Sequence, residues 1–197
     1  MDQFVRITKN ITFADLRSGK KQDVDAFEEQ IKSWLLNPIS LLASNSDTCF
    51  ENGYAMFALE LLFFEPHGKY LTGGKLGGSR QNFDKGFKDF LEYAVNNKFL
   101  NPDIAKLLES INIYSISRCG IYHTMSIKSG LLIDSINLDD KLIFYKNPVF
   151  DGLLVNPWNF SVALENYIYN YIKILRTKSD AQQYQNFSKS FKEFFNY

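Results

Sequence analysis

Histidine and cysteine are scarce in this chain of 197 residues, and their scarcity excludes several classes of site. There are two histidines, His67 and His123, and two cysteines, Cys49 and Cys119. Two cysteines do not build a disulfide framework, so we expect a reducing compartment. Neither a Cys-x2-Cys nor a His-Glu-x2-His spacing occurs, so the sequence predicts no metal site and no cofactor.

Net charge and long apolar runs are also missing. Lys+Arg and Asp+Glu balance at 22 each, so no overall field attracts nucleic acid, and any site for a polyanion must be a local patch. The longest apolar run, Tyr54–Phe64, contains Glu60 and is too short to span a bilayer. Residues 1–21 carry charges at intervals and offer no uninterrupted apolar segment of a signal peptide. We therefore expect a cytoplasmic protein that does not bind a membrane.

Apolar and aromatic side chains, by contrast, are abundant and recur at helical spacing. Hydrophobic residues make up 45% of the sequence and aromatic residues 16%, which is enough for a substantial core. We expect an all-α bundle of about five or six helices with a small β-hairpin inserted over roughly residues 126–147. The whole of 1–197 is expected to form a single domain with its core over roughly 25–176, after an irregular first 20 residues.

Prolines and capping residues predict the helix ends. Asp25-x-x-Glu28 resembles a capping box, and Asn101-Pro102 and Asn156-Pro157 each combine an N-cap with a proline at the first helical position. Pro38 and Pro66 are expected to end the first and second helices. The expected helices run over roughly 25–38, 48–64, 80–97, 101–118, 156–176 and, after a cap at Ser179-Asp180, 180–196.

The helix expected over 48–64 has apolar side chains on nearly every side, which is typical of a central helix. Glu60 is its charged exception. A buried carboxylate is costly unless it is paired. Glu60 is therefore expected either to join a structural ion pair or to orient Arg118 or His123.

Residues 68–79 are rich in glycine and basic residues, but a glycine stands where the Walker phosphate-binding pattern requires lysine. We interpret the segment as a mobile surface loop. It is either a flexible connector or a source of RNA-backbone contacts through Lys69, Lys75 and Arg80. His67, just before this segment, is expected to be a turn residue.

The segment 117–124 holds an arginine and a histidine five residues apart. Arg118 is a permanent cation with a fork of donors that suits phosphate oxygens, and His123 can take or give a proton near neutral pH. Five residues turn an ideal helix by about 500°, so the two side chains share no helical face unless Gly120 interrupts the helix. The pair is a minimal set for acting on a phosphodiester without a metal. Alternatively, both residues belong with Glu60 to a buried network in a helical scaffold.

The sequence Arg118-Cys119-Gly120-Ile121-Tyr122-His123 resembles the Arg-x4-6-His motif of the HEPN superfamily. Members are all-α domains found in bacterial toxins, abortive-infection proteins and other RNA-cutting defence systems. The context is similar too, because the motif comes near the end of a helix that follows a hydrophobic helix with an embedded acid. The resemblance covers about residues 25–176. One position departs, since active members often have a polar residue, commonly Asn, where Cys119 stands.

The resemblance implies a metal-independent endoribonuclease with a toxin or anti-phage defence role. In that chemistry the ribose 2′-hydroxyl attacks the adjacent phosphate and leaves a cyclic phosphate. His123 is then the base or the acid, and Arg118 holds the phosphate. Because one chain supplies a single such histidine, the resemblance implies a homodimer whose two motifs face each other.

The remaining assignments stay open at this stage. Cys119 is either an activated thiol or, more commonly, an inert one. Tyr122 either stacks on a base or contacts a phosphate, or it is a core or interface residue. The expected partners are RNA, a second copy of the chain, and an antitoxin or other defence-system protein. The alternative is a catalytically inactive HEPN-like domain that binds RNA, nucleotide or a protein partner.

Overall fold

The computed structural model describes residues 6–44, 49–115, 130–134, 141–146, 149 and 151–196. This part of the chain is mostly helical with a small three-stranded sheet, which confirms the expected all-α bundle with a small β insertion. The helices are α1 Phe13–Arg17, α2 Asp23–Ile31, the π-helix η2 Lys32–Leu36, α3 Asn37–Ser44, α4 Cys49–Leu62, α5 Phe64–Thr72, α6 Ser79–Asn96, α7 Pro102–Ser110, α9 Pro157–Thr177 and α10 Ala181–Phe195. The strands are β1 Leu131–Ile133, β2 Phe144–Lys146 and β3 Leu153–Val155.

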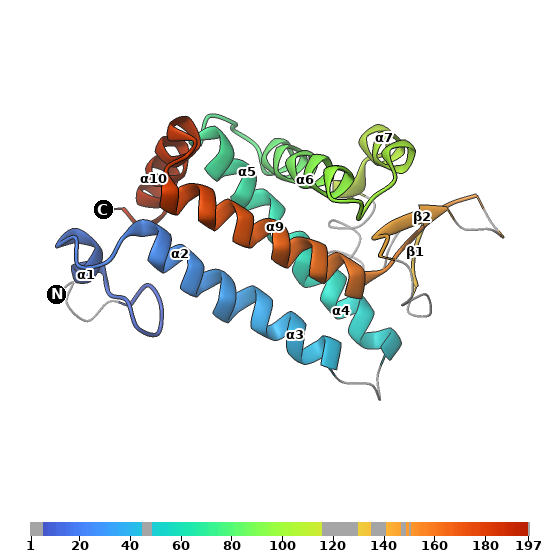
Figure 1. Cartoon of the computed structure of the whole chain (residues 1–197), viewed down its shortest axis with the longest axis horizontal. Helices are drawn as coiled ribbons and strands as arrows, with labels where there is room; N and C mark the ends of the chain where they lie inside the picture. The colour runs from blue at the N-terminus through green and yellow to red at the C-terminus, as the bar shows by residue number, and fades with distance from the viewer. Residues whose placement is uncertain are drawn as a thin grey trace.

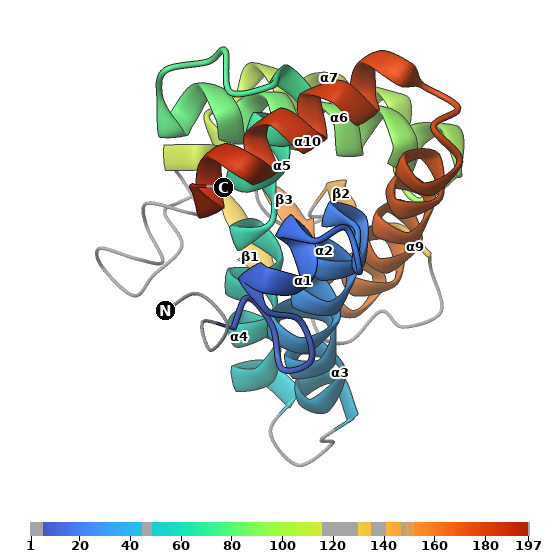
Figure 2. The same ribbon diagram turned by 90° about the vertical axis from the view of Figure 1, so that its left-hand side faces the viewer.

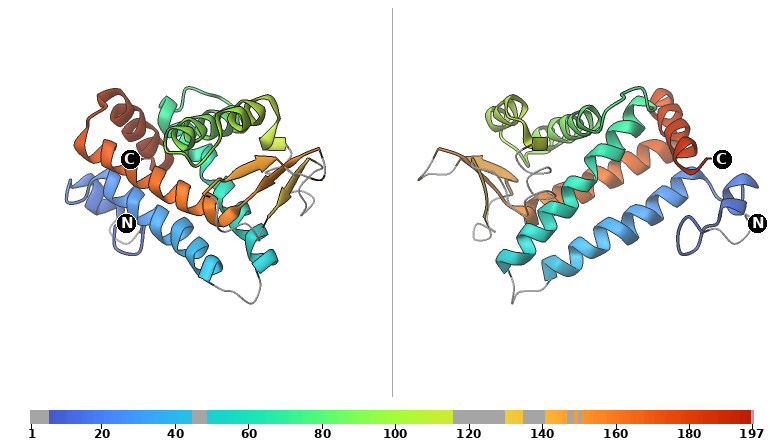
Figure 3. Two further views of the ribbon diagram at one scale, coloured as in Figure 1. Left: turned by 45° about the vertical axis from the view of Figure 1, so that its right-hand side comes forward. Right: turned by 180° about the vertical axis from the view of Figure 1, so that it is seen from behind.

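Three long helical segments form the body of the molecule (Figures 1 and 3). The first is α2 continued through η2 into α3, the second is α4 followed by α5, and the third is α9. The sheet lies at one end of these segments, and α1 and α10 lie at the other. α10 crosses α5, where the Ser190 hydroxyl donates to the Lys69 carbonyl at 3.0 Å (Figure 2).

Side-chain caps begin three helices where the sequence predicts them. Asn101, Asn156 and Asp180 each accept a hydrogen bond from a backbone N–H two or three residues further on. The start of α2 differs from the prediction. Its capping carboxylate is that of Asp25, which accepts from the backbone N–H of Gln22 at 3.0 Å, so the helix begins earlier than expected.

The expected stop at Pro38 is wrong. The π-helical turn η2 precedes it, and the backbone N–H of Asn37 donates to the carbonyl of Lys32, five residues earlier. A proline inside an α-helix has no N–H for the carbonyl four residues earlier, and its ring clashes with that carbonyl. The wider π-helical turn before Pro38 relieves this clash. The helix therefore continues into α3 and presents Ile39 to the core.

The expected stop at Pro66 and the loop expected over 68–79 are also displaced. α4 ends at Leu62, and Pro66 lies in the first turn of α5, where a backbone N–H has no helical partner to lose. α5 continues to Thr72, so the glycine-rich loop covers 73–78 alone. Gly73 ends α5 with φ of 64°, in the left-handed region that favours glycine.

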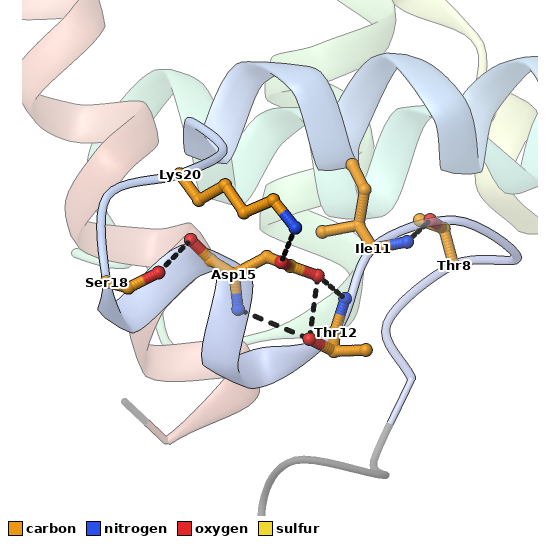
Figure 4. A network of polar contacts seen from close by, with 6 residues as sticks. All are labelled: Thr8, Ile11, Thr12, Asp15, Ser18 and Lys20. Carbon is orange, nitrogen blue, oxygen red and sulfur yellow. Dashed lines mark hydrogen bonds and ion pairs between the residues drawn. The ribbon is translucent and has the colours of Figure 1, made fainter.

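The first 20 residues are not irregular as expected, because they contain the short helix α1. Figure 4 shows its capping box, in which the Thr12 hydroxyl accepts from the Asp15 N–H and the Asp15 carboxylate accepts from the Thr12 N–H. The backbone N–H and hydroxyl of Thr12, together with Lys20 at 3.2 Å, lower the pKa of Asp15 to about 2.

α7 ends at Ser110 rather than continuing toward Arg118. The next residue, Ile111, is extended, with φ of −98° and ψ of 148°. The Asn112 side chain then accepts from the backbone N–H of Ser115 at 3.0 Å and begins a new turn. A local side-chain hydrogen bond thus competes with helix continuation at this point.

The β insertion is a three-stranded sheet rather than a hairpin. β3, which follows the expected 126–147 insertion, is the central strand, and it pairs with β1 in parallel and with β2 antiparallel. Within the expected insertion, residues 126–129, 135–140 and 147 lie outside the described part of the chain. The backbone N–H of Ile143 also donates to the Phe99 carbonyl at 2.9 Å, which attaches the sheet to the end of α6.

α5 and α6 cross at two glycines, Gly68 and Gly86. A Cβ built on Gly68 would lie 1.8 Å from the carbonyl oxygen of Asn82, and one built on Gly86 would lie 2.2 Å from that of Phe64. The two backbones are therefore in direct contact. This contact brings the ring centroid of Phe64 to 5.1 Å from that of Phe87, within the aromatic core.

Candidate functional site

The residues of the predicted motif, Arg118, Cys119, Tyr122 and His123, lie outside the described residues. The chain on either side of the motif is described. The ring centroid of Tyr114 lies 5.3 Å from that of Phe83 on α6. After the motif, Ile133 on β1 places its Cγ2 within 3.2 Å of where a Cβ on Gly53 of α4 would stand. The described flanks of the motif therefore pack on α6 and on α4, the helix that carries Glu60.

Glu60 is fully buried, as a charged residue in a central helix is expected to be. Neither of its carboxyl oxygens has a hydrogen-bond partner within the described ranges. Burial without compensation disfavours the charged form and raises the pKa of Glu60 well above its ordinary value. The described residues thus supply no cation for the expected ion pair, while Arg118 and His123 lie outside them.

We expect the buried carboxyl of Glu60 to make the protein less stable as the pH rises. A carboxyl whose pKa is higher in the folded chain binds its proton more tightly there, so stability is full below the unfolded pKa and falls as the pH climbs toward the folded pKa. The loss is about 1.4 kcal/mol per pH unit between the two values. Glu60→Gln removes this slope in denaturant unfolding measured between pH 5 and pH 8.

The matched control is Glu51→Gln, because Glu51 is an exposed glutamate on the same helix. It is expected to keep the wild-type pH dependence. If Glu60→Gln also keeps that dependence, Glu60 is ionised in the folded protein and is paired with a cation.

The three basic residues predicted to contact RNA do not form one patch. Arg80 lines a cleft of about 300 Å³ between α6 and α7, whereas Lys69 lines a separate hollow against α10. The Lys69 ammonium lies 5.2 Å from the ring centroid of Phe194. Lys75 is exposed in the 73–78 loop and lines neither depression.

The cleft that holds Arg80 offers little net attraction to phosphate. The Nε of Arg80 lies 3.6 Å from a carboxylate oxygen of Asp84, and the Nζ of Lys88 lies 3.7 Å from one of Glu109. These pairs are largely exposed, so each contributes little stability. They nevertheless balance the charge of the cleft, so Arg80 is a weaker candidate for an RNA contact than its sequence position indicates.

His67 is not a turn residue. It is fully buried in α5 and takes part in a polar array that sequence reasoning missed. Its Nε2 lies 2.5 Å from the Tyr167 hydroxyl on α9, and that hydroxyl donates to the carboxylate of Asp89 on α6. The Nε2 of His67 is 3.8 Å from the same carboxylate oxygen. Three helices therefore meet at one polar array, which is buried except for Asp89, whose side chain is 30% exposed.

The protonation states in this array follow from one another. Burial raises the pKa of Asp89, but the neighbouring imidazole of His67 and the hydrogen bond from Tyr167 outweigh it, so the net pKa is lowered and the carboxylate is ionised. An ionised carboxylate only accepts, so the Tyr167 hydroxyl donates to it. The Tyr167 oxygen then accepts from the Nε2–H of His67. Burial also lowers the pKa of His67, which leaves the ring neutral with an unprotonated Nδ1.

The close helix contact explains why the array forms. Gly68 follows His67 in sequence, and Gly86 precedes Asp89 by one turn, so the backbone contact at these glycines brings His67 to Asp89. The available sequence signal was a pair of glycines inside apolar helical patterns. Tyr167 is 100 residues from His67, and no local pattern connects the two.

Two other properties concern the described residues alone. They contain no group of three or more histidine, cysteine or acidic side chains arranged to hold a metal ion. Among their helices, none combines the length and the apolar character needed to cross a membrane.

Comparisons with protein-family models, curated proteins and solved structures gave no match.

Proposed function

We propose that this protein is a metal-independent endoribonuclease of the HEPN type that acts as a homodimer. The observation that carries the proposal is the sequence Arg118-x4-His123, a permanent cation and a titratable base five residues apart. The mostly helical fold supports it, because the resemblance implies an all-α domain. The packing of the described flanks on α4 and α6 supports it further, since α4 carries the embedded acid Glu60.

The proposed reaction needs three groups at the phosphodiester. A base removes the proton of the ribose 2′-hydroxyl, whose oxygen attacks the phosphorus as the bond to the 5′-oxygen breaks. An acid protonates that leaving oxygen, and fixed cations stabilise the charge on the phosphoryl oxygens. The products are a 2′,3′-cyclic phosphate and a 5′-hydroxyl. His123 serves as base or acid, and Arg118 binds the phosphoryl oxygens.

Two copies of the chain complete this set of groups. One histidine cannot be both base and acid in the same turnover, and His67 is engaged with Tyr167 in the buried array. A symmetric dimer whose motifs face each other supplies one His123 for each role and an Arg118 from each protomer. In this arrangement Glu60 lies on the helix against which the described flank of the motif packs, and an antitoxin or other defence protein is a further partner of the dimer.

Cleavage of RNA in excess EDTA tests the proposal. Wild type is expected to produce cyclic-phosphate ends, and Arg118→Ala to cleave about 10²-fold or more slowly, since it loses a phosphate-binding cation. Arg6→Ala is the matched control, because Arg6 is exposed and its guanidinium donates to the Lys9 carbonyl at 3.2 Å, on the N-terminal segment. It is expected to retain wild-type activity.

The second candidate is a catalytically inactive HEPN-like domain, which the cysteine at position 119 favours. That protein would bind RNA or nucleotide, or recruit a protein partner, without cutting. RNA binding with no cyclic-phosphate product from the wild type, in EDTA or in magnesium, would select this candidate over the nuclease.

A further inference from the structure

The cleft of about 300 Å³ that holds Arg80 has two walls. One wall is a single face of α6, whose lining side chains follow helical spacing: Arg80, Asp84, Phe87, Lys88 and Leu91. The other wall is the end of α7 with the residues after it, from Leu108 to Ile113. The apolar side chains Phe87, Leu91 and Leu108 are buried, whereas the charged side chains are exposed. An apolar floor with a polar rim suits a flat ligand that has apolar faces and polar edges.

Within the described part of the chain, the rim of this cleft carries two cations and two carboxylates. Arg80 lies 3.6 Å from Asp84, and Lys88 lies 3.7 Å from Glu109. Both distances are longer than the roughly 2.9 Å of an ideal N–H···O hydrogen bond, so these groups can bond to a ligand as well. Because the charges balance, the rim favours an uncharged ligand with donors and acceptors over a phosphate.

Guanine fits this rim better than the other RNA bases do. Its Watson–Crick edge places one acceptor, O6, beside two donors, N1–H and the 2-amino group, whereas each of the other three bases has a single donor group on that edge. A carboxylate accepts from two donors at once, and a guanidinium donates to a carbonyl oxygen. Asp84 and Arg80 present these two groups side by side on α6.

We propose that this cleft binds a guanine base of the RNA substrate, with Asp84 accepting from N1–H and the 2-amino group and Arg80 donating to O6. The inference rests on the proposed function, because it assigns the RNA that the nuclease selects. The cleft lies close to the motif along the chain. Ile113 on its wall precedes Arg118 by five residues, and five residues of extended chain span at most about 18 Å. The bound guanine therefore belongs to a nucleotide near the cleaved bond.

Two short RNA probes that differ by one amino group test the guanine site. Both are hexamers of 2′-O-methyluridine with one central purine, which is guanine in the first and hypoxanthine, lacking only the 2-amino group, in the second. Fluorescence anisotropy with the wild type is expected to show about tenfold tighter binding of the guanine hexamer, the ratio that one hydrogen bond to a carboxylate supplies. Equal affinities, or no binding of the guanine hexamer, would overturn the proposal.

Asp84→Asn is expected to make the two affinities equal, because an amide cannot accept both donors with two anionic oxygens. The ratio is the measured quantity, since loss of a negative charge strengthens the binding of both hexamers alike. Glu92→Gln is the matched control, an exposed acid on α6 outside the cleft, and is expected to keep the tenfold ratio. An Asp84→Asn protein that also keeps the ratio would place the guanine elsewhere and overturn the site.

The hexamers separate this proposal from the nuclease. They have no 2′-hydroxyl to attack the phosphate, so binding is measured without cleavage. A guanine preference in a protein that cuts no RNA would overturn the nuclease and leave the guanine site in place. RNA cleavage in EDTA together with equal affinities for the two hexamers would overturn the guanine site alone.

Discussion

Replacing His123 with alanine is expected to slow RNA cleavage by about 10²- to 10⁴-fold, the range that a positioned general acid or base contributes. The expected loss is large because the dimer loses both of its titratable groups at once. The rate is measured in EDTA from the appearance of cyclic-phosphate ends, with single-turnover conditions to separate cleavage from product release.

Thr124→Ala is the control for local disruption, because it changes the neighbouring residue and removes no proton-transfer group. It is expected to cleave like the wild type. A substrate with a 2′-deoxyribose at the cleaved position is expected to resist both proteins. His123→Ala activity equal to that of the wild type would rule out His123 as the acid or base.

Gly68→Ala is expected to destabilise the fold by at least about 3 kcal/mol, at the upper end of overpacking effects. The added methyl would stand 1.8 Å from the carbonyl oxygen of Asn82, a backbone atom that no rotamer change can move. α5 and α6 must therefore separate, which pulls His67 away from Asp89. The helix propensity that alanine gains over glycine, about 1 kcal/mol, is too small to offset this.

Gly77→Ala is the matched control for the glycine substitution, since nothing lies within 4 Å of a Cβ at Gly77. Denaturant unfolding followed by circular dichroism at 222 nm measures both variants. Gly77→Ala is expected to match the wild type to within about 0.5 kcal/mol. A Gly68→Ala protein as stable as this control would contradict the backbone contact between the helices.

The features that sequence reasoning predicts correctly are those decided by neighbouring residues. Asn101, Asn156 and Asp180 begin their helices because a short polar side chain satisfies nearby N–H groups whatever the rest of the chain does. The burial of Glu60 is correct for a similar reason, since apolar side chains on nearly every side of a helix indicate a central position.

Sequence reasoning misses the features that depend on contacts between distant residues or on a local change of helix type. Pro38 by itself predicts the end of a helix, but the π-helical turn before it lets the helix continue. Gly68 by itself predicts the beginning of a loop, whereas in the fold its missing side chain lets α6 approach α5. The error at Gly68 carried over to His67, which was expected in a turn and lies buried against Tyr167. Local propensity cannot supply such a contact.

The proposed shared site is tested most directly by a dimer that carries one intact motif. Wild type and His123→Ala bearing different affinity tags are co-expressed, and the mixed dimer is isolated through both tags. Its RNA cleavage in EDTA is compared with that of the wild-type dimer. We expect at least about a 10²-fold loss, because the single remaining His123 cannot be both base and acid. A mixed dimer that retains half of the wild-type activity would contradict a site shared between two copies.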